Sequence, residues 1–157
     1  MRFRKFKKRD IRQIAEIKNS VFSKFNSSEY FRKDAIDWYL DFTNPKKSDE
    51  ELLEAFHISD KSIFYVAEEN ERIIGYIKGS KDRIGNLFVL GSSHKKGVGK
   101  KLIELLEKEA KKQNSKKIKI KSSIYAVPFY QKMGYKKTTG VRNLHNLKIQ
   151  PMKKIIN

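Results

Sequence analysis

Cysteine is absent from the sequence, and proline and histidine occur only three times each. Without cysteine the chain has no disulfide framework and no thiolate metal site, and the histidines lack metal-ligand spacing, so we expect no bound metal. No apolar run approaches the roughly 20 residues of a membrane-spanning helix. The basic start, MRFRKFKKRDIRQ, lacks the apolar core of a signal peptide. We therefore expect a soluble, cytoplasmic protein without a membrane partner.

Acidic residues are also scarce, since 18 Asp and Glu stand against 36 Lys and Arg and give a formal net charge of +18. Such a charge suits a polyanionic partner: nucleic acid, an anionic membrane or a phosphate-rich cofactor. A lysine-rich genome or a hot habitat explains it equally well. The lysines are spread along the whole chain rather than gathered in a tail, so charge alone assigns no function.

The 157 residues suit one domain, 1–157, with a core of its own. Alternating and helical periodicities predict the elements in turn. The expected strands are 3–6, 62–69, 72–80, 83–90, 116–121, 135–139 and 147–155, and the expected helices are 11–22, 29–42, 48–56, 98–112 and 125–133. Asp10 and Gln13 form a capping-box pattern at the first helix. The order predicts an antiparallel meander, a helical crossover and then a strand parallel to the one before it.

A turn rich in glycine and lysine precedes the helix 98–112. A Walker A loop does not fit, because Gly91 to Gly97 is one residue too long and Lys101 replaces the hydroxyl residue. A dinucleotide fingerprint does not fit either, because Leu102 stands where the third glycine is needed. What remains is a strand, a turn and a helix N-terminus with free N–H groups, where Gly97 and Gly99 would let a pyrophosphate come close. A plain glycine turn with solvated lysines is the alternative.

Two segments carry a family resemblance. LFVLGSSHKKGVGKKLIELLEKEA (87–110) resembles the core motif of the GNAT superfamily of acetyl-CoA-dependent N-acetyltransferases, whose loop reads Q/R-x-x-G-x-G/A after a strand ending L-x-V. Leu87-Phe88-Val89 matches the strand end, and the loop match begins at His94, in the Gln/Arg position. YAVPFYQKMGY (125–135) resembles the family's A-x-x-F-Y-x-K-x-G-F segment. The two motifs stand in family order, and the element order of nearly the whole chain agrees.

The resemblance implies an α/β fold of the GNAT acyl-CoA N-acyltransferase type, with a mixed central sheet of six to seven strands flanked by helices. It implies acetyl-CoA as cosubstrate, with the acyl-pantetheine arm between two parallel strands that splay apart. The implied cofactor-binding residues are Phe88, Val89, Leu90, His94, Lys95, Lys96, Gly97, Val98, Gly99, Lys100 and Ser123. Ser123 takes the position of a family asparagine, and a hydroxyl donates one hydrogen bond with shorter reach. The N–H of Val89 or Leu90 is the implied oxyanion donor.

Tyr130 matches the family tyrosine that protonates the leaving thiolate, and packing in an aromatic-rich helix is its alternative role. No general base stands in the strands around the motif. Glu29 and the three aspartates of the aromatic helix (Asp34, Asp37, Asp41) are candidates, each more simply read as part of a solvated helix face. Relay of the proton by water is the alternative to a side-chain base. His57 and His145 are bystanders.

The expected reaction is acetylation of a primary amine, with a small molecule or a peptide as partner, no specific nucleic acid, and a monomer or homodimer as assembly. A basic nucleic-acid-binding module and an acyl-CoA sensor on the same fold are the alternatives. The acceptor pocket is expected to come from the first helices and the last strands. Its candidates are Phe25, Tyr30, Phe31, Trp38, Tyr39, Tyr125 and the loop 143–146.

Overall fold

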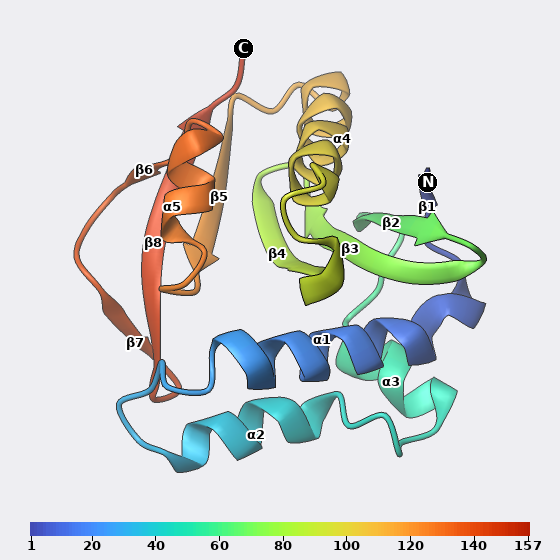
Figure 1. Ribbon diagram of the computed structural model, residues 1–157. Coiled ribbons are helices and arrows are strands. Elements are labelled where there is room, and N and C mark those ends of the chain that lie inside the picture. The colour runs from blue at the N-terminus through green and yellow to red at the C-terminus, as the bar shows by residue number, and fades with distance from the viewer.

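The computed structural model describes residues 1–157, and all eight strands join one mixed sheet. The strands are β1 (Arg2–Lys5), β2 (Ile63–Glu69), β3 (Arg72–Ser80), β4 (Arg83–Val89), β5 (Lys117–Ser122), β6 (Lys136–Lys137), β7 (Arg142–Leu144) and β8 (Leu147–Ile155). The order is β1-β2-β3-β4-β5-β8-β6, with β7 paired to β8. Only β4 and β5 pair in parallel, and the other pairs are antiparallel (Figure 1). The expected mixed sheet is confirmed, with β7 beyond the expected six to seven strands.

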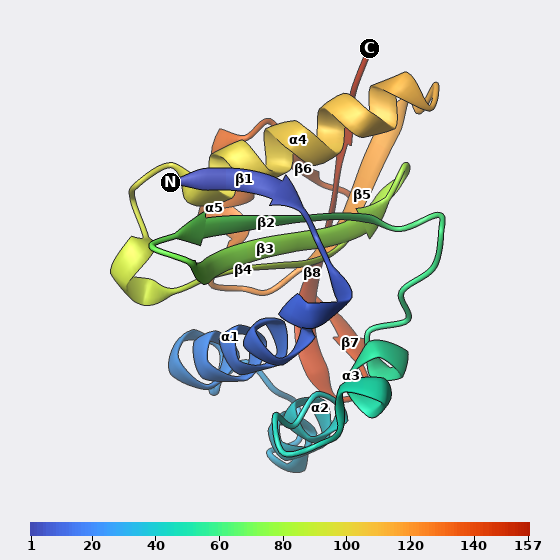
Figure 2. The same ribbon diagram turned by 90° about the vertical axis from the view of Figure 1, so that its right-hand side faces the viewer.

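Helices cover both faces of the sheet, as Figure 2 shows with α4 above the strands and α1 to α3 below them. The helices are α1 (Ile11–Phe25), α2 (Asp34–Phe42), α3 (Asp49–Ala55), α4 (Val98–Lys112) and α5 (Val127–Lys132), with short 3-10 turns at Lys8–Asp10 and Gly91–Ser93. None of the helices combines the length and the apolar character needed to cross a bilayer.

Two apolar cores lie on the two faces of the sheet. The stripe of α4, which includes Leu102, Ile103 and Leu106, packs on the sheet together with Tyr130 and Tyr135 from the α5 region. On the other face, the apolar sides of α1 and α3 pack against β2 and β3. All the apolar positions of α1 expected from its periodicity are buried, and Lys18 is buried among them. Each helix therefore buries one stripe, and its remaining side chains meet solvent.

Three local expectations are corrected by the structure. Asp10 does not cap α1 through its side chain; its carboxylate accepts hydrogen bonds from the Arg4 guanidinium (2.8 and 3.0 Å) and from the Lys7 N–H (2.8 Å). The second helix begins at Asp34 rather than at residue 29, because Tyr30 bridges to Leu147 instead. The segment 142–144 pairs with β8, where a loop was expected.

Candidate active site

The parallel strands β4 and β5 separate after a short stretch of pairing. Only Arg83 with Lys119 and Ile84 with Ile120 are partners, although β4 continues to Val89. Each strand stays hydrogen-bonded to its outer neighbour, β4 to β3 and β5 to β8, so the two halves of the sheet diverge (Figure 1). The end of β4 therefore has no strand partner on the side that faces β5.

Backbone directions at the end of β4 decide between the two expected oxyanion donors. The N–H of Leu90 donates to the carbonyl oxygen of Ile74 on β3 (2.9 Å), so it is not available. Because backbone groups alternate along a strand, the N–H and C=O of Val89 point the other way, into the gap. The Val89 carbonyl lies 2.7 Å from His94 Nε2. Of the two candidates, only the Val89 N–H faces the gap.

The glycine turn opens α4 toward the same gap. Gly97 lies in the left-handed region (φ 78°), and a Cβ built there would meet no atom within 4 Å. The N–H of Lys101 bonds to the Gly97 carbonyl (3.0 Å), so the N–H groups of the first turn precede this bond and are free. At Gly99 a Cβ would approach Phe129 to 3.1 Å, so this glycine lets α5 pack closely on α4. Sequence and geometry thus leave donors and open space at the positive end of the helix.

A first cavity, of about 420 Å³, lies between this turn, the end of β4 and α5. All the expected site residues line it except Leu90 and Lys96. Its wall on the α1 side is aromatic, since the Phe25 ring lies 4.9 Å from His94 and 5.0 Å from Tyr125. Phe25 and Tyr125, expected at the acceptor pocket, line this cavity and not the second one described below.

A second cavity, of about 720 Å³, opens over β5 and β8. It shares five lining residues with the first: Leu87, Phe88, Ser123, Ala126 and Tyr130. The two cavities therefore meet where β4 and β5 part. Among the aromatic residues expected at the acceptor pocket, Tyr39 lines the second cavity, whereas Tyr30, Phe31 and Trp38 line neither.

Tyr130 stands at this junction. Its side chain is buried, and its ring packs edge-on against Phe129 (5.3 Å) and Tyr135 (5.6 Å). No protein group hydrogen-bonds with its hydroxyl, and that oxygen is not among fully buried unpaired atoms, so it is open to the cavities. Burial raises the pKa of Tyr130 above that of a free phenol. The hydroxyl therefore keeps its proton at neutral pH and can donate it.

The candidate bases separate into two groups. Asp34, Asp37 and Asp41 are exposed on α2 and line neither cavity. Glu29 lines the second cavity, but its carboxylate accepts hydrogen bonds from the N–H groups of Ile124 (2.9 Å) and Tyr125 (2.8 Å) and from Asn26 (3.1 Å). Its geometry is that of a clamp between two loops. His57 and His145 line neither cavity.

Sequence reasoning missed a set of basic residues in the second cavity: Arg83, Lys117, Lys119, Lys121, Lys148 and Lys153. Glu29 is the one acidic residue in its lining. A signal for this set was present, because residues 111–157 contain thirteen Lys and Arg and no Asp or Glu. The lysines are scattered along the chain, as noted above, but the acids are not.

Comparisons with known proteins agree with this fold. Residues 27–156 match the family model described as "Acetyltransferase (GNAT) domain". Among solved structures, a GCN5-related N-acetyltransferase of Rhodopseudomonas palustris aligns with a TM-score of 0.79 at 19% identity, covering 98% of this chain and 94% of the other. The PaiA N-acetyltransferase of Thermoplasma acidophilum, in complex with coenzyme A, gives 0.74 at 18% identity and covers 98% of each chain. The aminoglycoside 6'-N-acetyltransferase of Enterococcus faecium gives 0.66 at 17% identity, covering 100% and 98%.

Proposed function

Because the chain belongs to the GNAT acetyltransferase family, we propose that it moves the acetyl group of acetyl-CoA to a primary amine of a small molecule or peptide. The observation that carries this proposal is the meeting of two cavities at the β4–β5 divergence, with Tyr130 at their junction. One cavity has the donors that a diphosphate needs, and the other gives an acceptor access to the same point. We propose that residues 1–157 act as one unit in this reaction.

The first cavity fits the cosubstrate by its chemistry. Free N–H groups at the start of α4 and the lysines Lys95 and Lys100 are suited to phosphate oxygens. The open space at the Gly97 Cβ position leaves room for them to approach. His94 holds the loop against the strand end through the Val89 carbonyl, and the aromatic wall offers apolar surface to the pantetheine arm. Ser123 lies at the junction, where its hydroxyl can donate one bond.

In the transfer, the amine nitrogen bonds to the acetyl carbon, the carbon–sulfur bond breaks, and one proton passes from nitrogen to sulfur overall. We propose that the Val89 N–H, which faces the gap between β4 and β5, stabilises the negative charge that develops on the carbonyl oxygen. We assign the proton donor to Tyr130, whose hydroxyl has no competing partner. Burial makes this phenol a weaker acid, but the same dry surroundings raise the proton affinity of the thiolate beside it. Glu29 is already engaged, so the amine has to arrive in its neutral form.

Ligand-dependent stability tests the proposal. Acetyl-CoA at 100 times its dissociation constant should add about 2.7 kcal/mol to the free energy of unfolding. Gly97→Asp should weaken this binding strongly by placing a carboxylate in the phosphate space, whereas the isosteric Gly97→Asn should weaken it much less. Aspartate and asparagine have the same shape and both tolerate the left-handed backbone at position 97, so the two variants differ only in charge. A melting temperature that saturating acetyl-CoA or CoA leaves unchanged would refute the assignment. A product-mass screen of amines and peptides then identifies the acceptor.

A further inference from the structure

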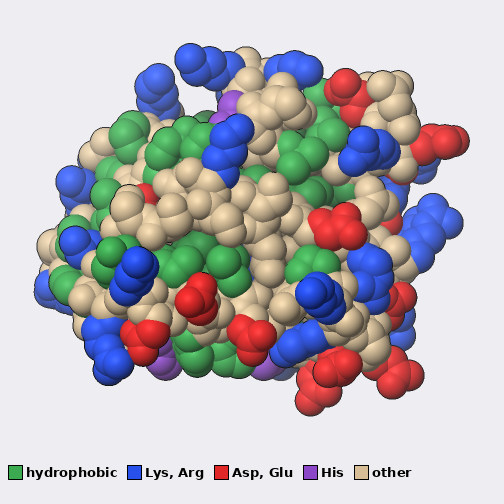
Figure 3. Space-filling model, turned by 60° about the horizontal axis from the view of Figure 1, so that its bottom comes forward, with side chains coloured by type: hydrophobic (Ala, Val, Ile, Leu, Met, Phe, Trp, Pro, Cys, Tyr) green, Lys and Arg blue, Asp and Glu red, His purple; other side chains and the backbone are tan.

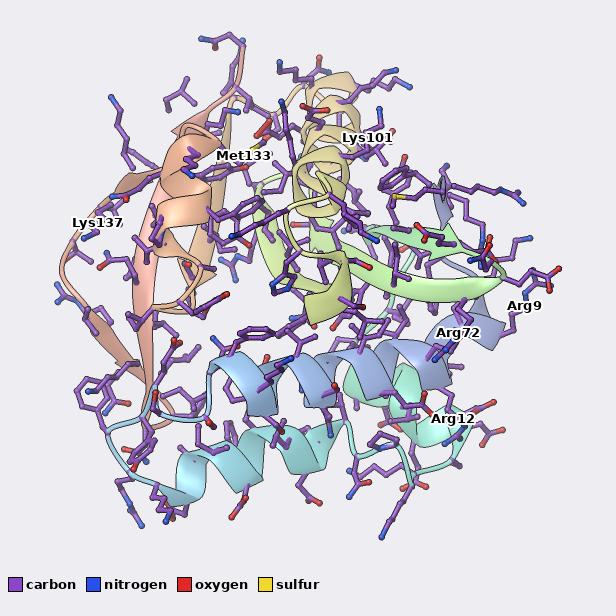
Figure 4. All side chains as sticks on the ribbon, in the orientation of Figure 1. Arg9, Arg12, Arg72, Lys101, Met133 and Lys137 are labelled. Atoms are coloured by element: carbon purple, nitrogen blue, oxygen red, sulfur yellow. The ribbon has the colours of Figure 1, made fainter.

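Four basic residues form a row across four strands on the open face of the sheet. Arg83 on β4 is the partner of Lys119 on β5, Lys119 is the partner of Lys153 on β8, and Lys153 is the partner of Lys136 on β6. Direct partners on neighbouring strands share a face, so the four side chains stand side by side. Three interstrand spacings make the row about 14 Å long. Lys137, the neighbour of Lys136, is at the outer edge of the sheet (Figure 4) and shares a face with Met152 instead.

A second line of charge crosses this row along β5. Its burial alternates, with Ile118 and Ile120 in the core and Lys117, Lys119 and Lys121 exposed. Alternate residues of a strand are about 6.6–6.8 Å apart, so the line extends about 13 Å. We name the two lines together the basic face, which consists of Arg83, Lys117, Lys119, Lys121, Lys136 and Lys153.

The basic face carries no counterions of its own. None of its side chains forms an ion pair, and none donates a hydrogen bond to another residue. Like charges directly opposite one another destabilise a sheet, so this arrangement has a cost that a bound anion would remove. Acidic side chains gather elsewhere, on α2 and in the first turn of α3, on the side of the molecule that Figure 3 brings forward. No acidic side chain therefore pairs with the charges of the basic face.

This face is continuous with the reaction site. All of its members except Lys136 line the second cavity. Ser123, at the junction of the two cavities, follows Lys121 by two residues. An acceptor whose amine lies at the junction therefore places the next 7–14 Å of its body over these cations.

The site also favours one kind of amine. Its lining holds one carboxylate, Glu29, and three donors already occupy most of the roughly four acceptor positions of that group, which makes it a poor base for an ammonium group. An α-amino group has a pKa of about 8, against about 10.4 for lysine, so far more of it is neutral at physiological pH. Nearby cations lower the pKa of an ammonium group further. A polypeptide amino terminus therefore needs less help from a base than a lysine side chain does.

We propose that the acceptor is the amino terminus of an Asp- and Glu-rich polypeptide segment, lying extended over the basic face. This rests on the proposed acetyltransferase function and names its substrate class. The line along β5, about 13 Å long, corresponds to about four extended residues, and side chains at alternate peptide positions match the spacing of its lysines. Arg83 and Lys153 flank this line at Lys119. A single-stranded nucleic acid is the lesser match, because it binds on stacking aromatic rings. The exposed aromatic residues, Phe31, Trp38, Phe42 and Tyr125, all lie outside the second cavity.

The test compares matched peptides with acetyl-CoA as donor. Ala-Asp-Glu-Asp-Glu should be acetylated with a kcat/KM at least tenfold above that of Ala-Asn-Gln-Asn-Gln, which has the same shape without charge, and the ratio should fall as salt is raised. The triple variant Arg83→Gln, Lys119→Gln, Lys153→Gln should lose at least tenfold on the acidic peptide while acetyl-CoA affinity stays constant. The control variant Lys108→Gln, Lys111→Gln, Lys112→Gln removes three charges from α4 and should keep the preference.

The contrary results separate a failure of the proposed substrate class from a failure of the proposed function. Equal or faster turnover of the amide peptide, spermidine or an aminoglycoside refutes the inference and leaves the acetyltransferase function standing. Free glutamate turned over as well as the acidic peptide overturns the choice of a polypeptide. Single-stranded RNA that binds in physiological salt and blocks acetylation of every amine overturns that choice in favour of nucleic acid. Absence of both acetyl-CoA binding and any amine turnover refutes the proposed function itself.

Discussion

Replacement of Glu29 by glutamine separates a structural clamp from a general base. The carboxylate joins the loop after α1 to the turn before α5, since Oε1 accepts from the Ile124 N–H and from Asn26, and Oε2 accepts from the Tyr125 N–H. That turn leads directly into the helix that carries Tyr130. The clamp therefore positions the proposed proton donor against the end of β4.

The size of the effect follows from these three bonds. Glutamine keeps one acceptor oxygen and turns an NH₂ group toward one backbone N–H, which loses its partner. Bonds to a charged acceptor contribute about 1.5–3 kcal/mol each and neutral ones about 1 kcal/mol, so replacing three charged bonds by two neutral ones costs about 2.5–7 kcal/mol. Because Glu29 is only half-buried, solvent screening reduces this, and we expect about 2–4 kcal/mol. For a chain of this length, 3 kcal/mol corresponds to a fall in melting temperature of about 6–12 °C.

Thermal unfolding and steady-state kinetics across pH measure both roles at once. A clamp predicts lower stability, a raised KM for the acceptor and an unchanged pH profile. The control Glu16→Gln removes the same charge from an exposed position of α1 and should change neither quantity. Wild-type stability combined with a kcat loss of 10²-fold or more, and loss of the acidic limb of the pH profile, would show instead that Glu29 is the base.

Three further variants test other parts of the structure. Tyr130→Phe should lower kcat at least tenfold and leave the acetyl-CoA dissociation constant unchanged by calorimetry; full activity would rule out its role as the acid. Burial lowers the pKa of Lys18 to about 7, so between about pH 7 and 10 the unfolded chain holds a proton that the folded chain lacks, and stability rises by about 1.4 kcal/mol per pH unit. Lys18→Met should flatten that rise in urea unfolding at pH 7 and 9, and an unchanged slope would contradict it. Glu107→Ala leaves the Tyr135 hydroxyl and the Lys154 ammonium without their shared acceptor and should cost about 2 kcal/mol, with urea unfolding as the measurement and wild-type stability as the contrary result.

Local patterns predicted the elements whose signals lie within one segment. The bounds of α4 agree with the expectation because its apolar stripe is continuous, and α3 begins within one residue of the expected start at 48, with Ser48 accepting a hydrogen bond from the Glu51 N–H as its cap. The antiparallel pairing of the expected strands 62–69 and 72–80 is also confirmed, and their turn residues Asn70 and Glu71 lie in the left-handed region. Asp10 escaped prediction because its partner, Arg4, belongs to a different element. The capping pattern of residues 10–13 does not include Arg4, whose guanidinium binds the carboxylate that would otherwise cap the helix.

The cosubstrate side and the acceptor side of the proposed site also differ in how local their sequence signals are. Most of the proposed cosubstrate side is contiguous in the sequence, from His94 to Lys100, so a strand, a glycine turn and a helix start, together with the family resemblance, were enough to propose it. On the acceptor side, the alternation KIKIK could place three lysines on one face of β5, but Arg83 and Lys153 join them through pairings more than 30 residues apart. Register between distant strands is set by the whole sheet and not by any single segment. Net charge read as a total concealed this arrangement, whereas the distribution of the few acids, which leaves residues 111–157 without one, pointed toward it.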